Sequence, residues 1–295
     1  MLVIATTNET KNMPDSLLRA GRFDRLYRVN YPTEGDSFAL LKHFLSDKPV
    51  SSKINTEDLS KMMASVSCAE LESLLNSAAI LAASKRKESI EMEDMVEPIL
   101  QAEYGLAPIN HNEQFAEQTK KVALHEAGHL VTAEVLDPGC IGLVSVRVNN
   151  FKGEVQGFVR RCKSNTNRRK EILITLAGKV ATELYHSETC ASGCSGDLRR
   201  AKKVIYEGIT ESGTCGVGFL CDAPLYGATE SLHAQREATI HAEMERYMFK
   251  VRDILLKNRA FLEKAAEALA EKETLLYSDI REIRESVEVV TNEQN

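Results

Sequence analysis

The sequence lacks any long apolar run. No stretch approaches the ~18 apolar residues of a membrane-spanning helix, and no charged segment followed by a hydrophobic core opens the chain as a secretory signal would. It also lacks a basic excess, because 37 Lys and Arg residues are mixed with 43 Asp and Glu residues to give a formal net charge of −6. These absences predict a soluble chain that does not bind nucleic acid through its phosphates.

Paired metal-binding cysteines are missing as well. Seven cysteines, an odd number, in 295 residues without a signal peptide favour a reducing intracellular setting over a disulfide framework. Two loops are flanked by cysteines, one by Cys190 and Cys194 and the other by Cys215 and Cys221. Neither spacing is a C-x-x-C unit, so we interpret these residues as small buried or loop thiols rather than as ligands of a structural zinc.

The length and the hydrophobic pattern predict more than one folded unit. The chain opens on an apolar run, Leu2 to Ala5, that predicts a buried strand of a parallel sheet. Apolar residues at helical spacing from about Asp36 to Leu106 predict a small helical bundle. Glycine, proline and asparagine between Tyr104 and Phe115 indicate a linker, so we expect a second domain from about Asn112.

This second domain is predicted to be mostly helical with a small antiparallel sheet. Valines 144, 146 and 148 alternate with polar residues, and the run from Val155 to Phe158 follows them as a second strand. A first helix is predicted from Glu117 to Leu136, where Asp137-Pro138-Gly139 ends it, and a second from Asn167 to His186, in which Ala177-Gly178 allows close helix packing. Asp197 opens a third helix after the Cys190 to Gly196 loop. Amphipathic helices follow over Ser231 to Val287.

The sharpest signal is His125-Glu126-Ala127-Gly128-His129. Two histidines four residues apart project from one face of a helix and can bind one metal ion. Glu126, beside the first histidine, is placed to take a proton from water that attacks a carbonyl group. The spacing therefore predicts a catalytic zinc site in which His125 and His129 are ligands and Glu126 is the general base.

The third ligand is less well defined by the residues themselves. Asp197 follows a Ser/Gly-rich loop, where an acidic side chain is equally suited to ligate a metal or to begin a helix. Glu183 is the other carboxylate candidate, either as a ligand or as a partner that orients an imidazole. Three later histidines compete with them: His186, His233 and His241.

The order of motifs resembles the FtsH family of AAA ATP-dependent zinc metalloproteases from about Leu2 to Glu285. The matching segments are Ile4-Ala5-Thr6-Thr7-Asn8, Leu18-Arg19-Ala20-Gly21-Arg22-Phe23-Asp24-Arg25, a helical lid, His125 to His129, Ala177-Gly178, and Gly193-Cys194-Ser195-Gly196-Asp197-Leu198. The resemblance implies that residues 1–35 are the end of an AAA α/β core, 36–107 its helical lid and 112–290 a zinc metallopeptidase domain. The expected fold class is therefore mainly α, with a remnant of an α/β module and a small sheet in the peptidase domain.

The resemblance also implies roles for individual residues. It makes Asp197 the third zinc ligand and the segment from Gly153 to Phe158 an edge strand on which an extended substrate pairs through its backbone. Asn8 would sense the terminal phosphate of ATP, and Arg19 and Arg22 would be arginine fingers that reach the ATP of a neighbouring subunit. Without the resemblance, a surface network of arginines and aspartates is the plainer interpretation of that region.

Several parts of the family pattern are missing from this sequence. It contains no G-x-x-x-x-G-K-[ST] phosphate loop, so we do not expect this chain to hydrolyse ATP alone. The family's magnesium-binding strand, pore loop and membrane anchor would lie upstream of Met1, which leads us to expect a fragment or a truncated form. The lid carries Ser65 to Leu71 where the family has a Gly-rich turn, which puts adenine contacts there in question.

The predicted function is zinc-dependent endoproteolysis of unfolded or misfolded proteins. By resemblance we expect Zn²⁺ as cofactor, ATP and Mg²⁺ only in an intact assembly, a homo-oligomer that is hexameric in the family, and a cytoplasmic location at a membrane face if an anchor is present. Two alternatives are a non-catalytic assembly subunit that donates Arg19 and Arg22 to a paralogue, and a peptidase that works without ATP.

Overall fold

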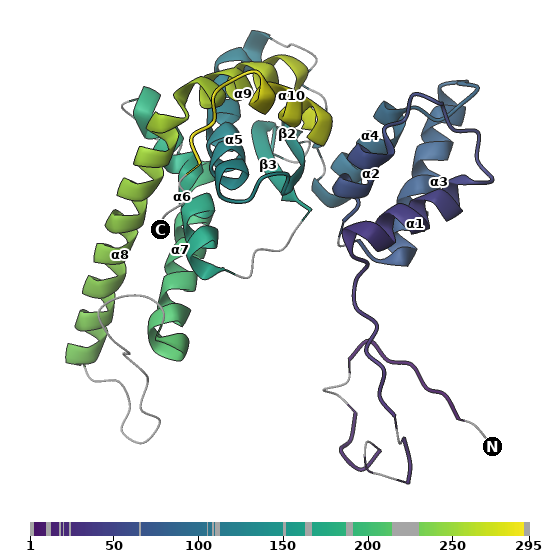
Figure 1. The fold of residues 1–295 in the computed structure, drawn as a ribbon, viewed down its shortest axis with the longest axis horizontal. Coiled ribbons are helices and arrows are strands. Elements are labelled where there is room, and N and C mark those ends of the chain that lie inside the picture. Colours follow the sequence, from purple (N-terminus) through teal and green to yellow (C-terminus); the bar gives the residue numbers. More distant parts are fainter. Residues whose placement is uncertain are drawn as a thin grey trace. The chain divides into compact units, whose positions relative to one another are not determined.

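The computed structural model describes residues 3–9, 13–17, 19, 21–23, 25–64, 66–104, 106–107, 109, 113–149, 152–162, 167–186, 191–213 and 230–291. The chain divides into two compact units, Met1–Tyr31 and Pro32–Asn295. The helices and strands of the described residues belong to the second unit, which is mostly helical (Figure 1). The prediction of a mainly α chain with a small sheet is therefore confirmed, whereas the assignment of residues 1–35 to an AAA core stays a prediction.

The first unit corrects one expectation. The predicted strand at Leu2 to Ala5 is absent from the part of it that the structure describes, since Val3 to Ala5 have no regular structure and Val3 and Ile4 are 57% and 78% exposed. A strand is stable only when its backbone N–H and C=O groups pair with a neighbouring strand. No strand of the described residues in this unit offers that pairing, so apolar character alone does not produce a strand here.

Four helices open the second unit where the bundle is predicted: α1 (Glu34–Leu45), α2 (Thr56–Met62), α3 (Cys68–Ser84) and α4 (Met92–Tyr104). Helices α1 and α3 start at capping boxes, in which Thr33 and Ser67 exchange hydrogen bonds with Asp36 and Glu70. Their shared core includes the fully buried residues Leu59, Met62, Leu71, Leu75 and Ile99. The Ser67-x-x-Glu70 cap gives a physical reason for the unusual lid sequence at this point.

The predicted helix–sheet–helix order of the next segment is confirmed. A 3-10 turn (Glu113–Phe115) leads into α5 (Ala116–Leu136), which is followed by β2 (Ile141–Asn149), β3 (Glu154–Arg161) and α6 (Arg168–Tyr185). Gly139, with φ of +73°, turns the chain after α5. The Glu134 carboxylate accepts hydrogen bonds from the Gly139 and Ile141 amides and fixes this turn.

The sheet is antiparallel and asymmetric. Strand β2 pairs with β3 along one edge, and with β1 (Leu106–Ala107) and β4 (Thr274–Leu276) along the other. Among the strands that the structure describes, β3 pairs only with β2, so its outer edge is unpaired. Val155 and Val159 pack with the core around α5 and α6, whereas Phe158 packs with the α1–α4 core, so alternate residues of β3 face different layers.

The remaining helices surround α5 and α6. They are α7 (Ala191–Glu207), continued by a π-helical turn (Gly208–Ser212), then α8 (Glu230–Lys257), α9 (Arg259–Lys272) and α10 (Tyr277–Glu285). The long helix α8 lies alongside α6 and α7 (Figure 1). Its Tyr247 is fully buried, as is Phe261 of α9, so these helices complete one continuous core behind α5.

Candidate metal centre

Helix α5 carries the predicted motif on its most buried stretch. Every residue from Ala123 to Val135 is buried, and His125, Glu126 and His129 are only 6%, 6% and 9% exposed. The Nε2 atoms of the two imidazoles lie 3.1 Å apart. Two polar rings buried face to edge in this way require polar partners, which α6 and α7 supply.

The tautomer of His129 is fixed by helix α6. Its Nδ1 lies 2.7 Å from the carbonyl oxygen of Ile174. Because a carbonyl oxygen can only accept, Nδ1 carries a hydrogen and donates it, so the neutral form of this ring has its lone pair on Nε2. An imidazole oriented by a backbone carbonyl in this way is a pre-oriented metal ligand.

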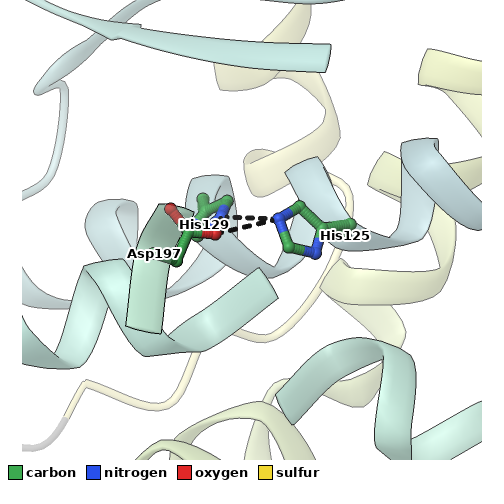
Figure 2. Close-up of side chains that lie close together, drawn as sticks. All are labelled: His125, His129 and Asp197. Carbon is green, nitrogen blue, oxygen red and sulfur yellow. Dashed lines mark hydrogen bonds and ion pairs between the residues drawn. The ribbon is translucent and has the colours of Figure 1, made fainter. Parts of the chain in front are cut away.

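Asp197 completes the group from helix α7. Its Oδ2 lies 3.1 Å from Nε2 of His125 and 3.3 Å from Nε2 of His129 (Figure 2). The structure corrects the expectation that Asp197 opens a helix, because α7 begins six residues earlier at Ala191. Asp197 is therefore an interior residue of α7, and the helix-capping interpretation of this carboxylate does not hold.

The three side chains suit a tetrahedral cation. Ligand atoms bound to zinc at ~2.0–2.1 Å in tetrahedral geometry lie about 3.3–3.4 Å from one another. The two Nε2 atoms and Oδ2 are separated by 3.1, 3.1 and 3.3 Å, close to that triangle. Two imidazoles and one carboxylate are also a donor set that zinc favours, with a fourth position left for substrate or water.

Gly178 of α6 leaves the space that such an ion needs. A Cβ at this position would lie 2.5 Å from Nε2 of both His125 and His129. The predicted close packing at Ala177-Gly178 is thus confirmed, and its purpose is clearer in the structure than in the sequence. A side chain of any size at Gly178 would fill the cradle that the three ligands surround.

A cleft of about 470 Å³ opens beside the three ligands. Its walls come from α5, the edge strand β3, the first half of α6 and the middle of α7. Gly157 brings the backbone of β3 against Glu126, since a Cβ at this glycine would lie 2.3 Å from Cγ of Glu126. The cleft therefore presents the three candidate ligands, Glu126 and the edge of β3 that no other described strand pairs with to the same space.

Comparison with known proteins agrees with this geometry. The sequence model of peptidase family M41 matches residues 113–283, more than half of the chain.

The chain belongs to peptidase family M41.

Curated relatives of this M41 chain confirm the resemblance to FtsH. Proteins named ATP-dependent zinc metalloprotease FtsH from Caldicellulosiruptor bescii and Streptobacillus moniliformis are 29% and 30% identical to it over 96% and 95% of its length. ATP-dependent zinc metalloprotease FtsH 1 from Thermomicrobium roseum is 31% identical over 93%. The chain spans about half of the length of these relatives, namely 49%, 42% and 45%.

The charges of the M41 site are strongly coupled. Burial disfavours the charged form of His125, but the Asp197 carboxylate and Cys194 overcome it and raise the pKa of His125 to about 10. Burial also opposes ionisation of Asp197, yet hydrogen bonds from His125 and His129 hold its pKa below the usual range. Burial raises the pKa of Glu126, so this carboxylate holds a proton more tightly than an exposed glutamate does.

The structure adds two contacts that the sequence did not reveal. Sγ of Cys194 lies 3.9 Å from Nδ1 of His125, and the Ile174 carbonyl holds His129. Cys194 stands three residues before Asp197 on α7, so a helical reading of that loop would have placed both on one face. Cys190, Cys215 and Cys221 lie outside the described residues.

The other candidate ligands lie elsewhere. Glu183 forms an ion pair with Lys179, and its Oε2 lies 3.8 Å from Nη2 of Arg252 on α8. In the described structure it forms no ion pair with either imidazole. Its predicted role in orienting an imidazole is therefore wrong, because α6 approaches the ligands at Gly178 and Glu183 points toward α8. His186, His233 and His241 are not in the group of three ligand side chains either.

The residues predicted to sense nucleotide lie in the first unit. Asn8, Arg19 and Arg22 are exposed, and the guanidinium of Arg22 donates to the Ser16 carbonyl at 2.8 Å. Their roles stay predictions.

Among the helices that the structure describes, none is both long and apolar enough to cross a bilayer.

Proposed function

We propose that this chain is a zinc-dependent endopeptidase. The observation that carries the proposal is the triangle of His125, His129 and Asp197 in one cleft with the buried carboxylate of Glu126. Bound zinc would polarise the carbonyl group of the substrate and acidify water. The names of the M41 relatives, which are zinc metalloproteases, support the same assignment.

In the proposed mechanism Glu126 moves the protons. Its carboxylate accepts a proton from the attacking water and later delivers it to the nitrogen of the leaving amine. Burial supports this role, since a raised pKa makes the carboxylate a better base than an exposed glutamate. Contact with Gly157 holds the Glu126 side chain against β3, where the peptide bond would lie.

The substrate is proposed to be an extended, unfolded segment of protein. Among the described strands only β2 pairs with β3, and an extended peptide that pairs with the other edge of β3 along the cleft would bring a peptide bond beside Gly157 and Glu126. Backbone pairing uses groups that every residue has. Unfolded clients of different sequence could therefore be cut at one site.

Removal of the metal is expected to stop proteolysis. After dialysis against a chelator the chain should no longer cleave casein, and about one equivalent of Zn²⁺ should restore cleavage, because bound zinc would polarise the scissile carbonyl group and acidify the attacking water. Cleavage rate and bound zinc, measured on the same samples, test this prediction. Cleavage that persists in the metal-free protein would exclude the proposed mechanism.

ATP is proposed to act only in a larger assembly. The relatives are named ATP-dependent, and the exposed Arg19 and Arg22 would reach the nucleotide of a neighbouring subunit. Mixing the chain with a full-length relative should then raise the ATPase rate per full-length subunit, and Arg19→Ala with Arg22→Ala should cancel the rise. The exposed Arg28 of the same unit provides a control, Arg28→Ala. A rate unaffected by the chain would argue against shared ATP sites.

A further inference from the structure

One end of the cleft carries two guanidinium groups around a single carboxylate. Nη2 of Arg161, at the end of β3, lies 2.5 Å from Oε2 of Glu171, and Nη2 of Arg200, on α7, lies 2.6 Å from its Oε1. All three residues line the cleft. The two ion pairs thus connect β3, α6 and α7 at this end of the cleft.

This group lies a defined distance from the metal ligands. Glu171 precedes Gly178 by seven residues on α6, which corresponds to about 10 Å along the helix axis. Arg161 follows Gly157 by four residues and faces the same side of β3, which corresponds to about 13 Å of extended chain. A peptide lying along β3 with its scissile bond beside Gly157 would therefore bring its third or fourth residue to this group.

The group has a surplus of positive charge and of hydrogen-bond donors. Two guanidinium ions against one carboxylate leave a net charge of +1, and Glu171 is only 14% exposed. The Arg200 side chain is 62% exposed, so its unused donors are open to the cleft. Nη1 of Arg161 is buried without a hydrogen-bond partner among the described residues. The two other charged residues outside the catalytic group, Lys152 and Glu154, line the cleft at the opposite end of β3.

We propose that Arg161, Glu171 and Arg200 form a substrate subsite that selects a carboxylate, the side chain of Asp or Glu three or four residues from the scissile bond. This inference rests on the proposed peptidase function and adds a substrate preference to it. Glu171 fixes the two guanidinium planes, and the unbalanced charge attracts the acidic residue. The guanidinium group also suits bidentate binding of a carboxylate.

Peptide binding tests this subsite separately from catalysis. The probes are labelled peptides with a central apolar pair that differ only in carrying Glu, Gln or Lys at the third and fourth positions on either side of it. Their binding to zinc-loaded Glu126→Gln protein is measured by fluorescence anisotropy. We expect the peptide with Glu at one of these positions to bind roughly two- to fivefold more tightly than the peptide with Gln at the same position, the range of a partly exposed charge pair. The preference should shrink as salt is raised.

Charge reversal on neighbouring residues provides the control. Arg200→Glu should invert the preference so that the Lys peptide binds best, whereas Arg199→Glu should retain it, because exposed Arg199 bonds to Ser195 and does not line the cleft. Equal binding of the Glu, Gln and Lys peptides, or no binding of any, would overturn the subsite. An acidic preference that inverts in Arg200→Glu, together with wild-type protein that cuts none of the peptides, would support the subsite and reject the proposed function.

Discussion

Glu126→Gln is expected to reduce casein cleavage by roughly 10²- to 10⁴-fold, the contribution of a well-placed general base. The amide has the shape of the carboxylate, so its contacts with Gly157 of β3 should survive. It cannot accept the proton of water, however, and the reaction loses its base. Zinc should stay bound at one equivalent, because Glu126 is not one of the three ligand side chains.

The matched control for this variant is Glu117→Gln on the same helix. Glu117 is 85% exposed and pairs with Lys121 one turn along α5, so its loss removes one surface charge and leaves the site untouched. Cleavage rate, zinc content and thermal unfolding are measured on the two variants side by side. Normal cleavage by Glu126→Gln would show that the protons move through another group.

The metal motif was predictable because it is local. Four residues of separation on a helix determine that His125 and His129 share a face, whatever the rest of the chain does. The alternating valines of β2 and the Asp137-Pro138-Gly139 stop of α5 are local signals of the same kind, and the structure contains both elements. Local spacing thus predicted the shared face of the two histidines and the elements around them.

The parts that were not predictable depend on contacts between distant segments. Asp197 reaches His125 across 72 residues of sequence, and its position in α7 is set by packing against α6 and α8. The carbonyl of Ile174 carries no side-chain signal at all, so its bond to His129 is visible only in the structure. Leu2 to Ala5 shows the converse case, since an apolar run predicts a strand only where a partner strand exists.

The position of Gly178 leads to a prediction as large as that for Glu126. Gly178→Ala is expected to abolish stoichiometric zinc binding and with it casein cleavage, because the added methyl group would lie 2.5 Å from Nε2 of both histidines. Helix propensity alone predicts the opposite direction, since alanine inside a helix is favoured over glycine by about 1 kcal/mol. A variant that unfolds at a higher temperature yet no longer binds zinc would separate these two effects.

Gly196→Ala is the matched control for this prediction. Gly196 lies in α7 directly beside Asp197, but in the described part of the chain no atom beyond its chain neighbours and the nearby backbone of its own helix lies within 4 Å of the place where its Cβ would be. The variant should therefore keep zinc and activity and gain a little helix stability. Zinc affinity, measured by competition with a chelating dye, is expected to fall at least ~100-fold for Gly178→Ala, the scale of an overpacked core. Unchanged affinity in both variants would mean that the ion does not occupy the space between Gly178 and the two imidazoles. The ligand triangle alone would then no longer locate the metal.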